Sequence, residues 1–258
     1  MHGHAPRKRF GQNFLADRYY VERIVAAIDP RPGDNLVEIG PGLAALTGLL
    51  IERAGSIAAV EIDRDLAARL REAFPPDRLQ LYEADALAFD FGLLGPDLRV
   101  VGNLPYNISS PLLFHLAAFD VLLRDAHVML QREVVARMTA GPGTPDYGRL
   151  SVMLQIRFAI TRLFTVPAGA FRPAPKVESA VARLVPLGTA RPRIDDPALF
   201  ARIVAAAFGQ RRKTLRNALS TVVSVETLER AGIDPGARGE VLSVDAFIRL
   251  ANCAATPP

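Results

Sequence analysis

The stretch LVEIGPGL, residues 36–43, decides the fold of this 258-residue chain. Four residues typical of a buried strand run directly into a Gly-Pro-Gly turn, and a helix-forming segment follows. This order of strand, glycine turn and helix brings backbone close to a nucleotide-like ligand, because glycine has no side chain to hold the ligand away. The stretch therefore predicts the first unit of a nucleotide-binding α/β sheet, with the glycine turn beside the ligand.

The same alternation of short strands and amphipathic helices continues on both sides of this stretch, after an initial helix at 18–28. Apolar runs predict strands at 35–39, 57–61, 78–82, 98–102 and 126–130, with helices at 43–54, 64–74, 110–118 and 131–139. A further helix and strand are expected within 149–166, and a last strand at 179–185 is expected to close the sheet. Alternation of this kind predicts an α/β fold, a Rossmann-like parallel sheet with helices on both faces.

A change of composition marks a domain boundary at residues 188–197, where glycine and proline occur among charged residues. We therefore predict a catalytic, cofactor-binding domain over residues 1–187, including a basic N-terminal lead-in. A small helical domain is expected over residues 188–258, with helices at 197–208, 210–222, 225–231 and 243–251.

Composition narrows the classes of function. The formal net charge of +4 and a sequence pI near 9.6 are compatible with a polyanionic partner. Cys253 is the only cysteine, which excludes an intramolecular disulfide and a cysteine zinc cluster, and the four histidines show no ligand spacing, so we expect no metal. Because the sequence has neither an apolar leader nor an apolar run of membrane-spanning length, we expect a soluble, cytoplasmic protein without membrane contact.

Two acidic residues follow the glycine turn at the ends of the next two predicted strands. Glu61 is placed to accept hydrogen bonds from both hydroxyls of a ribose, and Asp85 to accept one from an adenine amino group. The pattern Gly40-x-Gly42-x-x-Ala45 alone leaves a dinucleotide oxidoreductase open. The carboxylate at adenine depth favours S-adenosylmethionine, a sulfonium ligand without a pyrophosphate.

A candidate catalytic motif, Asn103-Leu104-Pro105-Tyr106, follows the fourth predicted strand, where ligands of open α/β sheets bind. An adenine amine is a poor nucleophile because its lone pair is delocalised into the ring. The Asn103 side-chain oxygen and the carbonyl of Leu104 or Pro105 could each accept one amine hydrogen, and the proline would make this turn rigid. Tyr106 offers a face for base stacking, and Phe171, in a proline-rich loop, is a candidate for the opposite face. The motif therefore predicts methylation of an amine.

Further motifs occur in order along nearly the whole chain: GQNFL at 11–15, VEIGPGL at 37–43, EID at 61–63, ADAL at 84–87, NLPYNISSP at 103–111, QREVVAR at 131–137, YGRLS at 147–151, FRPAPKV at 171–177 and FGQRRKTL at 208–215. Together they resemble the KsgA family of ribosomal RNA adenine dimethyltransferases, also called RsmA. The resemblance implies a class I methyltransferase sheet and an activity that converts two adjacent adenosines, in a hairpin near the 3′ end of 16S rRNA, to N6-dimethyladenosines.

The resemblance also implies partners and site residues. The substrate would be 16S rRNA within the small ribosomal subunit or its precursor, during subunit biogenesis, and we expect the enzyme to be a monomer. Methyl-donor contacts are implied at Asn13, Leu15, Gly40, Glu61, Asp85 and Asn103. One departure is Ala44, where the family usually has glycine; an extra methyl just inside the helix would narrow the donor pocket slightly.

Two basic clusters suit contact with RNA phosphates, which position a substrate without reading its sequence. We expect the first near the cofactor entrance and the second on one helical stretch of the small domain, which would then contact RNA or the ribosome. The predicted RNA-binding residues are Arg7, Lys8, Arg9, Arg211, Arg212, Lys213 and Arg216.

Two alternatives besides the oxidoreductase stay open. A large-subunit RNA adenine methyltransferase of the antibiotic-resistance (Erm) type shares the cofactor and Asn-x-Pro-Tyr motifs, although residues 107–111 and 210–213 favour KsgA. A non-catalytic assembly factor, or a transcription factor descended from the fold, would only bind nucleic acid. The presence of Glu61, Asp85, Asn103 and Tyr106 argues against such a loss of catalysis.

Overall fold

A computed structural model describes residues 13–210 and 212–256 as two compact units. In the described part of the chain, the first unit comprises residues up to 135 and 159–186, and the second comprises 136–158 and 187 onward. The division differs from the predicted one in segment 136–158. This segment belongs to the second unit because Tyr147 and Ile156 are buried in its hydrophobic cluster.

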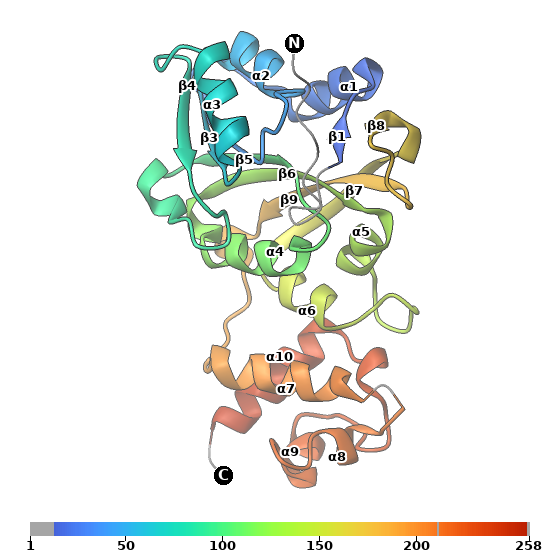
Figure 1. Ribbon diagram of the computed structural model, residues 1–258. Helices are drawn as coiled ribbons and strands as arrows, with labels where there is room; N and C mark the ends of the chain where they lie inside the picture. The colour runs from blue at the N-terminus through green and yellow to red at the C-terminus, as the bar shows by residue number, and fades with distance from the viewer. Residues whose placement is uncertain (1–12, 211, 257–258) are drawn as a thin grey trace. The chain divides into compact units, whose positions relative to one another are not determined.

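The first unit contains a seven-stranded sheet within the described residues, in the order β4-β3-β2-β5-β6-β9-β7 (Figure 1). Its strands are β2 (Asn35–Ile39), β3 (Ile57–Glu61), β4 (Leu79–Glu83), β5 (Leu98–Asn103), β6 (Leu123–Gln131), β7 (Phe158–Val166) and β9 (Ser179–Pro186). Strands β2 to β6 are parallel, as expected for a Rossmann-like sheet, whereas β9 runs antiparallel to β6.

One expectation about the sheet is wrong. The last predicted strand does not close the sheet at its edge, because β9 lies between β6 and β7. Its register pairs Gln131 with Ser179 and Val128 with Ala182. The residues of β9 from Ser179 to Ala182 are fully or almost fully buried, which is what an interior strand requires.

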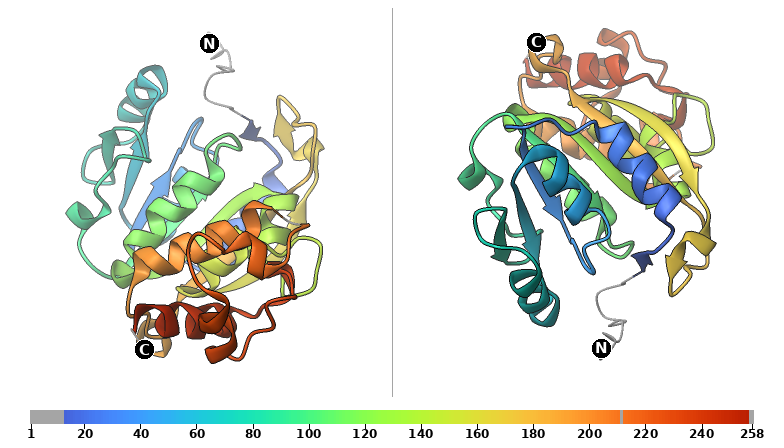
Figure 2. Two further views of the ribbon diagram at one scale, coloured as in Figure 1. Left: turned by 90° about the horizontal axis from the view of Figure 1, so that it is seen from below. Right: turned by 90° about the horizontal axis from the view of Figure 1, so that it is seen from above.

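Helices cover both faces of this sheet. The helices of the first unit are α1 (Arg18–Ile28), α2 (Thr47–Ala54), α3 (Arg64–Ala73) and α4 (Ser109–Ala118), and α5 (Arg132–Thr139) follows β6. In Figure 2, α1 and α2 lie against one face of the sheet and α4 against the other. Helix α1 begins after Asp17, whose side chain accepts a hydrogen bond from the Tyr19 amide, and it buries Ile24, Val25 and Ile28 at helical spacing.

A short two-stranded sheet lies outside the main one. Strand β1 (Phe14–Leu15) pairs antiparallel with β8 (Phe171–Arg172), with Leu15 opposite Phe171. Both of these side chains are buried in the hydrophobic cluster of the first unit. The N-terminal strand is therefore fixed to a segment more than 150 positions further along the chain.

The second unit is helical and has its own apolar core. Its helices in the described residues are α6 (Arg149–Gln155), α7 (Pro197–Gly209), α8 (Leu215–Ala218), α9 (Val225–Arg230) and α10 (Val244–Ala255). The predicted helix at 210–222 is reduced to α8, and turns flank it. Phe200 and Phe247 are almost completely buried in the core, and the buried Tyr147 donates a hydrogen bond to the Leu242 carbonyl at 2.9 Å. Among the described residues, no helix has both the length and the apolar character needed to span a membrane.

Candidate active site

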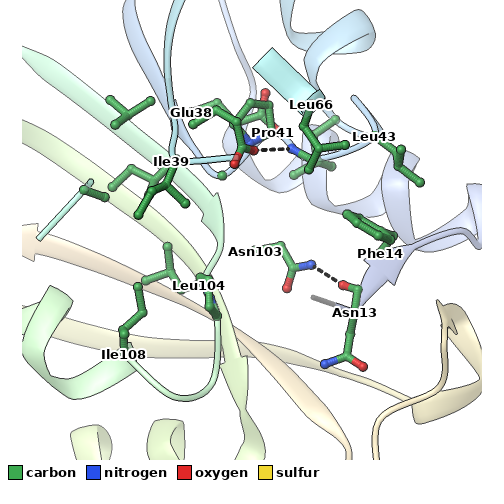
Figure 3. Close-up of a pocket in the computed structure, with 18 of the residues that line it drawn as sticks. Asn13, Phe14, Glu38, Ile39, Pro41, Leu43, Leu66, Asn103, Leu104 and Ile108 are labelled. Atoms are coloured by element: carbon green, nitrogen blue, oxygen red, sulfur yellow. Dashed lines mark hydrogen bonds between the residues drawn. The ribbon is translucent and has the colours of Figure 1, made fainter. Parts of the chain in front are cut away.

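A cavity of about 210 Å³ opens in the first unit at the carboxyl ends of the parallel strands (Figure 3). Of the predicted site residues, those that line it are Asn13, Leu15, Gly40, Glu61, Asp85, Asn103, Leu104, Pro105 and Tyr106. They come from β1 and the residue before it, from the ends of β3 and β5, and from the loops that follow β2, β4 and β5, because parallel strands end at one edge of a sheet. The geometry thus brings the predicted donor-binding and catalytic residues together.

Glu61 lies at the end of β3 and is almost fully buried. Its Oε2 accepts a hydrogen bond from the Gly42 amide at 3.1 Å, and its Oε1 accepts one from the Asp63 amide at 2.9 Å. Burial raises the pKa of this carboxyl, although the backbone hydrogen bonds act in the opposite direction. Glu61 is therefore a preorganised acceptor aimed at the glycine turn.

A second buried carboxyl, Glu38 on β2, also lines the cavity. Its Oε2 accepts a hydrogen bond from the Thr47 hydroxyl at 2.7 Å. Burial, reinforced by the charge of Glu61, raises the pKa of Glu38 to about 7, against the opposing effect of the Thr47 hydrogen bond. Within the described residues, neither Glu38 nor Glu61 forms an ion pair, so this end of the sheet favours a cationic ligand.

The glycine turn between β2 and α2 has a backbone conformation that suits glycine. Gly40 and Gly42 have φ values of 67° and 58°, in the left-handed region that favours glycine. A Cβ atom at Gly42 would lie 3.1 Å from the Phe14 ring, tighter than an ordinary contact. Glycine at residue 42 therefore allows β1 to approach the turn and to form one wall of the cavity.

Ala44 differs from the expectation. It lies in the turn before α2, with a φ of 65°, and α2 begins only at Thr47. The predicted helix at 43–54 therefore starts late, and the extra methyl of alanine strains the backbone where glycine would not. Ala44 packs against the hydrophobic cluster of the unit and is not among the residues that line the cavity, so it does not narrow the pocket as predicted.

Asp85 occupies the loop after β4. Its Oδ1 accepts a hydrogen bond from the Leu87 amide at 2.9 Å, and its backbone carbonyl accepts one from the Ala88 amide at 3.0 Å. These bonds form a small turn that fixes the carboxylate at the cavity wall. Within the described residues its other oxygen accepts no hydrogen bond, which leaves it available for a ligand.

The side chain of Asn103, at the end of β5, is held in one orientation. Its Nδ2 donates a hydrogen bond to the Asn13 carbonyl at 3.0 Å, which turns its oxygen toward the open centre of the cavity (Figure 3). The next residue is also fixed, since the Leu104 amide donates to the Met129 carbonyl at 3.0 Å. The acceptor oxygen of Asn103 is therefore positioned before any substrate arrives.

The rest of the turn decides which carbonyl can act beside Asn103. The Pro105 carbonyl already accepts hydrogen bonds from the Ser109 hydroxyl at 3.1 Å and the Ile108 amide at 3.2 Å. A carbonyl oxygen has two lone pairs, so both are used in this way. The sequence left Leu104 and Pro105 open as alternatives, and the geometry favours the Leu104 carbonyl.

Phe171 is a correction to the predicted site. Its side chain is completely buried in the hydrophobic cluster beneath β1, where β8 pairs with Leu15, and it is not among the residues that line the cavity. The sequence predicted that this aromatic residue, in a proline-rich loop, would be accessible for stacking against a base. The pairing of β8 with β1 instead turns its side chain into the core. In this structure Tyr106 lines the cavity without Phe171 opposite it.

Several lining residues were missed by the sequence reasoning. Apolar side chains complete the walls, and their signal was adjacency to the predicted polar residues: Phe14 precedes Leu15, Leu43 follows Gly42, Ile62 follows Glu61, and Leu87 lies two residues after Asp85. Leu43 and Ile62 are exposed at the rim, with 49% and 44% of their surfaces accessible. A flat apolar ligand group such as adenine would cover them.

The predicted RNA-binding residues divide into two groups. Arg7, Lys8, Arg9 and Arg211 lie outside the described residues. Arg212 and Lys213 are exposed in the turn before α8, and Arg216 is exposed within α8, so they do not share one continuous helix as expected. Their contact with RNA stays a prediction.

The chain matches the family described as ribosomal RNA adenine dimethylase over residues 3–256. It is 59% identical to ribosomal RNA small subunit methyltransferase A of Aromatoleum aromaticum, covering 98% of this chain and 95% of that protein. It is 60% identical to the protein of the same name from Thiobacillus denitrificans, covering 98% and 99%.

A solved structure with a similar fold is a dimethyladenosine transferase from Plasmodium falciparum. It superposes with a TM-score of 0.77 at 25% identity, covering 92% of this chain and 95% of the other. The 23S rRNA methyltransferase ErmE superposes with a TM-score of 0.70 at 28% identity, covering 95% and 100%. Both are similar to this chain over more than nine-tenths of its length, so the geometry alone does not choose between small- and large-subunit RNA.

Proposed function

The chain belongs to the ribosomal RNA adenine dimethylase family, and we infer from this premise how its cavity performs the reaction. It is an S-adenosylmethionine-dependent enzyme that dimethylates adenosines in 16S rRNA of the small ribosomal subunit. We propose that the targets are two adjacent adenosines in a hairpin near the 3′ end of 16S rRNA. The enzyme acts on them as a monomer, in the small subunit or its precursor.

The cavity residues fit the methyl donor. Bound S-adenosylmethionine supplies an electrophilic methyl group on a positively charged sulfur. Glu61 would hold the ribose hydroxyls and Asp85 the adenine amine, while Asn13, Leu15, Gly40 and Asn103 complete the contacts. The two buried carboxylates without a cationic partner and the apolar rim match a cationic ligand that carries a flat ring.

The observation that carries the mechanism is the hydrogen bond from Asn103 to the Asn13 carbonyl. It leaves the Asn103 oxygen free to accept one hydrogen of the target amine, and the Leu104 carbonyl accepts the other. Holding both hydrogens draws the nitrogen toward tetrahedral geometry and makes its lone pair available for attack. A strong general base is unnecessary, because the methylated amine is a cation and loses its proton readily.

Methyl transfer to isolated ribosomal subunits tests this proposal. Small subunits lacking the modification and large subunits are incubated in parallel with labelled S-adenosylmethionine, and digested nucleosides are analysed by mass. We expect dimethyladenosine at two adjacent positions of 16S rRNA only. Transfer to large-subunit RNA alone would favour the Erm-type alternative, and binding to the small subunit without transfer would favour a non-catalytic assembly factor.

A further inference from the structure

A fully buried serine contacts the catalytic turn. The Ser179 hydroxyl lies 2.6 Å from the Tyr106 hydroxyl, within hydrogen-bond distance, and none of the Ser179 surface is accessible. Ser179 is not among the residues that line the cavity. Ser179 therefore contacts the catalytic turn, but neither donor binding nor alignment of the target amine requires it.

The backbone around Ser179 is fixed by the main sheet. Ser179 is the first residue of β9 and pairs with Gln131 at the end of β6. On the preceding residue, the Glu178 carbonyl accepts a hydrogen bond from the Arg132 amide at 2.9 Å. The strand pairing thus fixes the backbone that carries the serine hydroxyl.

The other partner, Tyr106, has more freedom. It lies in the turn between β5 and α4 and is only partly buried, so the rotation of its ring is not fixed by packing alone. A hydrogen bond at the far end of the phenol fixes both the direction of the side chain and the position of its hydroxyl. Burial raises the pKa of Tyr106, so the phenol stays neutral at the pH at which the enzyme works.

We propose that Ser179 is a positioning residue for the target base: its hydrogen bond with Tyr106 holds the phenol ring in the orientation on which the adenine stacks. The inference rests on the proposed stacking role of Tyr106. A base that stacks on a fixed ring reaches the Asn103 oxygen in the correct register, whereas a base on a rotating ring does not. The catalytic edge is therefore built from both the parallel and the antiparallel parts of the sheet.

A purely structural role for Ser179 predicts a different result. A buried hydroxyl that only satisfies its own hydrogen bond would change the unfolding temperature when removed and would leave turnover per folded molecule unchanged. Ser151 provides a matched control, because it is also completely buried and donates a hydrogen bond to the Arg137 carbonyl at 2.5 Å, in the second unit. Ser151→Ala should lower the unfolding temperature alone.

The test compares Ser179→Ala, Tyr106→Phe and the double variant by steady-state methyl transfer to small subunits. Each single substitution should lower kcat roughly tenfold, because misplacement of a reacting group by about 1 Å can reduce rates by up to about 100-fold. The KM for S-adenosylmethionine should stay within twofold. Since both changes remove the same bond, the double variant should be no slower than the slower single variant.

Two outcomes would overturn the inference. One is a kcat for Ser179→Ala within twofold of the wild type, and the other is a double variant whose loss equals the product of the two single losses. Donor binding by calorimetry and thermal unfolding identify the folded fraction of each variant, and Tyr106→Phe tests the same bond if Ser179→Ala does not fold. A wild-type enzyme that transfers no methyl to the small subunit would refute the proposed function instead.

Discussion

The carboxyl ends and the amino ends of the parallel strands, here called the carboxyl edge and the amino edge of the main sheet, both contain buried ionisable side chains. The two edges differ in how these side chains are paired. At the carboxyl edge, Glu38 and Glu61 are like charges beside an open cavity, without an ion-pair partner in the described residues. At the amino edge, Arg99 is buried between two carboxylates: its Nη1 lies 2.7 Å from Asp34 and its Nε 3.0 Å from Asp125. One edge has buried carboxyl groups without a cationic partner, and at the other edge the buried charges neutralise one another.

The amino edge forms a continuous network. The Arg99 Nη2 also donates to the Ile28 carbonyl at 2.6 Å, and Arg124 donates to the second oxygen of Asp34, likewise at 2.6 Å. Burial alone would raise the pKa of Asp34, but the hydrogen bonds from the Arg31 amide, Arg99 and Arg124 outweigh it and lower that pKa. The network connects the end of α1 to the starts of β2, β5 and β6.

This difference separates structure from function within one sheet. Buried charges that pair with one another hold the strands together and leave no unpaired charge for a ligand to bind. Buried carboxyl groups without a cationic partner have raised pKa values, and a cation from outside stabilises their ionised forms. The position of the uncompensated carboxylates therefore marks the binding edge independently of any motif.

The largest expected effect comes from breaking the amino edge. Arg99→Met leaves Asp34 and Asp125 buried without their main cation, and removal of one partner from a buried network typically costs about 3–5 kcal/mol. We expect a loss of this size in the free energy of unfolding, measured by urea denaturation. Arg124→Met is the control, because Arg124 is half exposed and should contribute less than about 1 kcal/mol. Equal losses from both variants would contradict the special role of the buried arginine.

A substitution at the carboxyl edge should act on turnover instead. Asn103→Ala removes an acceptor aligned with the reacting amine, and loss of one preorganised group typically lowers kcat by about 100- to 1000-fold. Steady-state methyl transfer measures this effect, while binding to small subunits should be retained. Thermal unfolding close to that of the wild type, in contrast to Arg99→Met, would confirm that the two edges have separate roles. A tenfold or smaller loss of kcat would count against Asn103 as the amine acceptor.

The pH dependence of stability sharpens the comparison further. The folded-state pKa of Glu38, about 7, lies above its ordinary value of 4.5, so the folded protein keeps this proton where the unfolded chain has lost it. The resulting stabilisation is complete below about pH 4.5 and is lost as the pH rises through about 7.

We therefore expect the free energy of unfolding to fall between pH 5 and pH 7 by about 2 kcal/mol more in the wild type than in Glu38→Gln. Urea titrations at a series of pH values give this difference directly, with other titrating groups cancelling between the two proteins. Parallel pH profiles for the two proteins would mean that Glu38 is already ionised at pH 5.

The smallest expected effect concerns the turn beside the cavity. Ala44→Gly relieves a left-handed backbone conformation and should raise the free energy of unfolding by up to about 1 kcal/mol, less the greater flexibility of glycine in the unfolded chain. Ala45→Gly is the matched control, since its φ is not positive, and it should destabilise by about 0.5–1 kcal/mol. Thermal unfolding distinguishes a rise from a fall, and destabilisation in both variants would contradict the strain at Ala44.

Local pattern was enough to predict most of the first unit. The strands at 35–39 and 57–61 and the helix at 18–28 match the structure residue for residue, because apolar runs and a capping aspartate act within a few residues. Glu61, Asp85 and Asn103 were found for the same reason, because each lies at the end of a recognisable strand or just after it, whereas Asn13 was implied only by the family resemblance. The exception in this unit was the strained turn at Ala44, and in the second unit it was the short α8.

What the sequence could not supply are contacts between distant segments. The insertion of β9 between β6 and β7, the pairing of β1 with β8 and the inward position of Phe171 all depend on pairing partners that no local pattern specifies. Ser179 was missed for the same reason, since its partner Tyr106 lies 73 residues earlier. Arg99 did carry a signal, as a charged residue inside an otherwise apolar strand, but its two acidic partners could not be identified without the fold.

The position of β9 in the sheet determines which parts of the active site a nascent chain can form first. The residues that line the cavity all lie between Asn13 and Ile108, so the ribosome makes them before β9. Until β9 has emerged, β6 is an open edge whose buried core residues, Val128 to Leu130, have nothing to pair with on one side. A chain released before residue 179 would thus contain the residues that line the cavity, and its β6 would be an aggregation-prone edge strand, unpaired on one side. It would lack β9, whose Ser179 we propose to position the target base. In an enzyme assembled in this order, the contact between Ser179 and Tyr106, which we propose to position the target base, forms last.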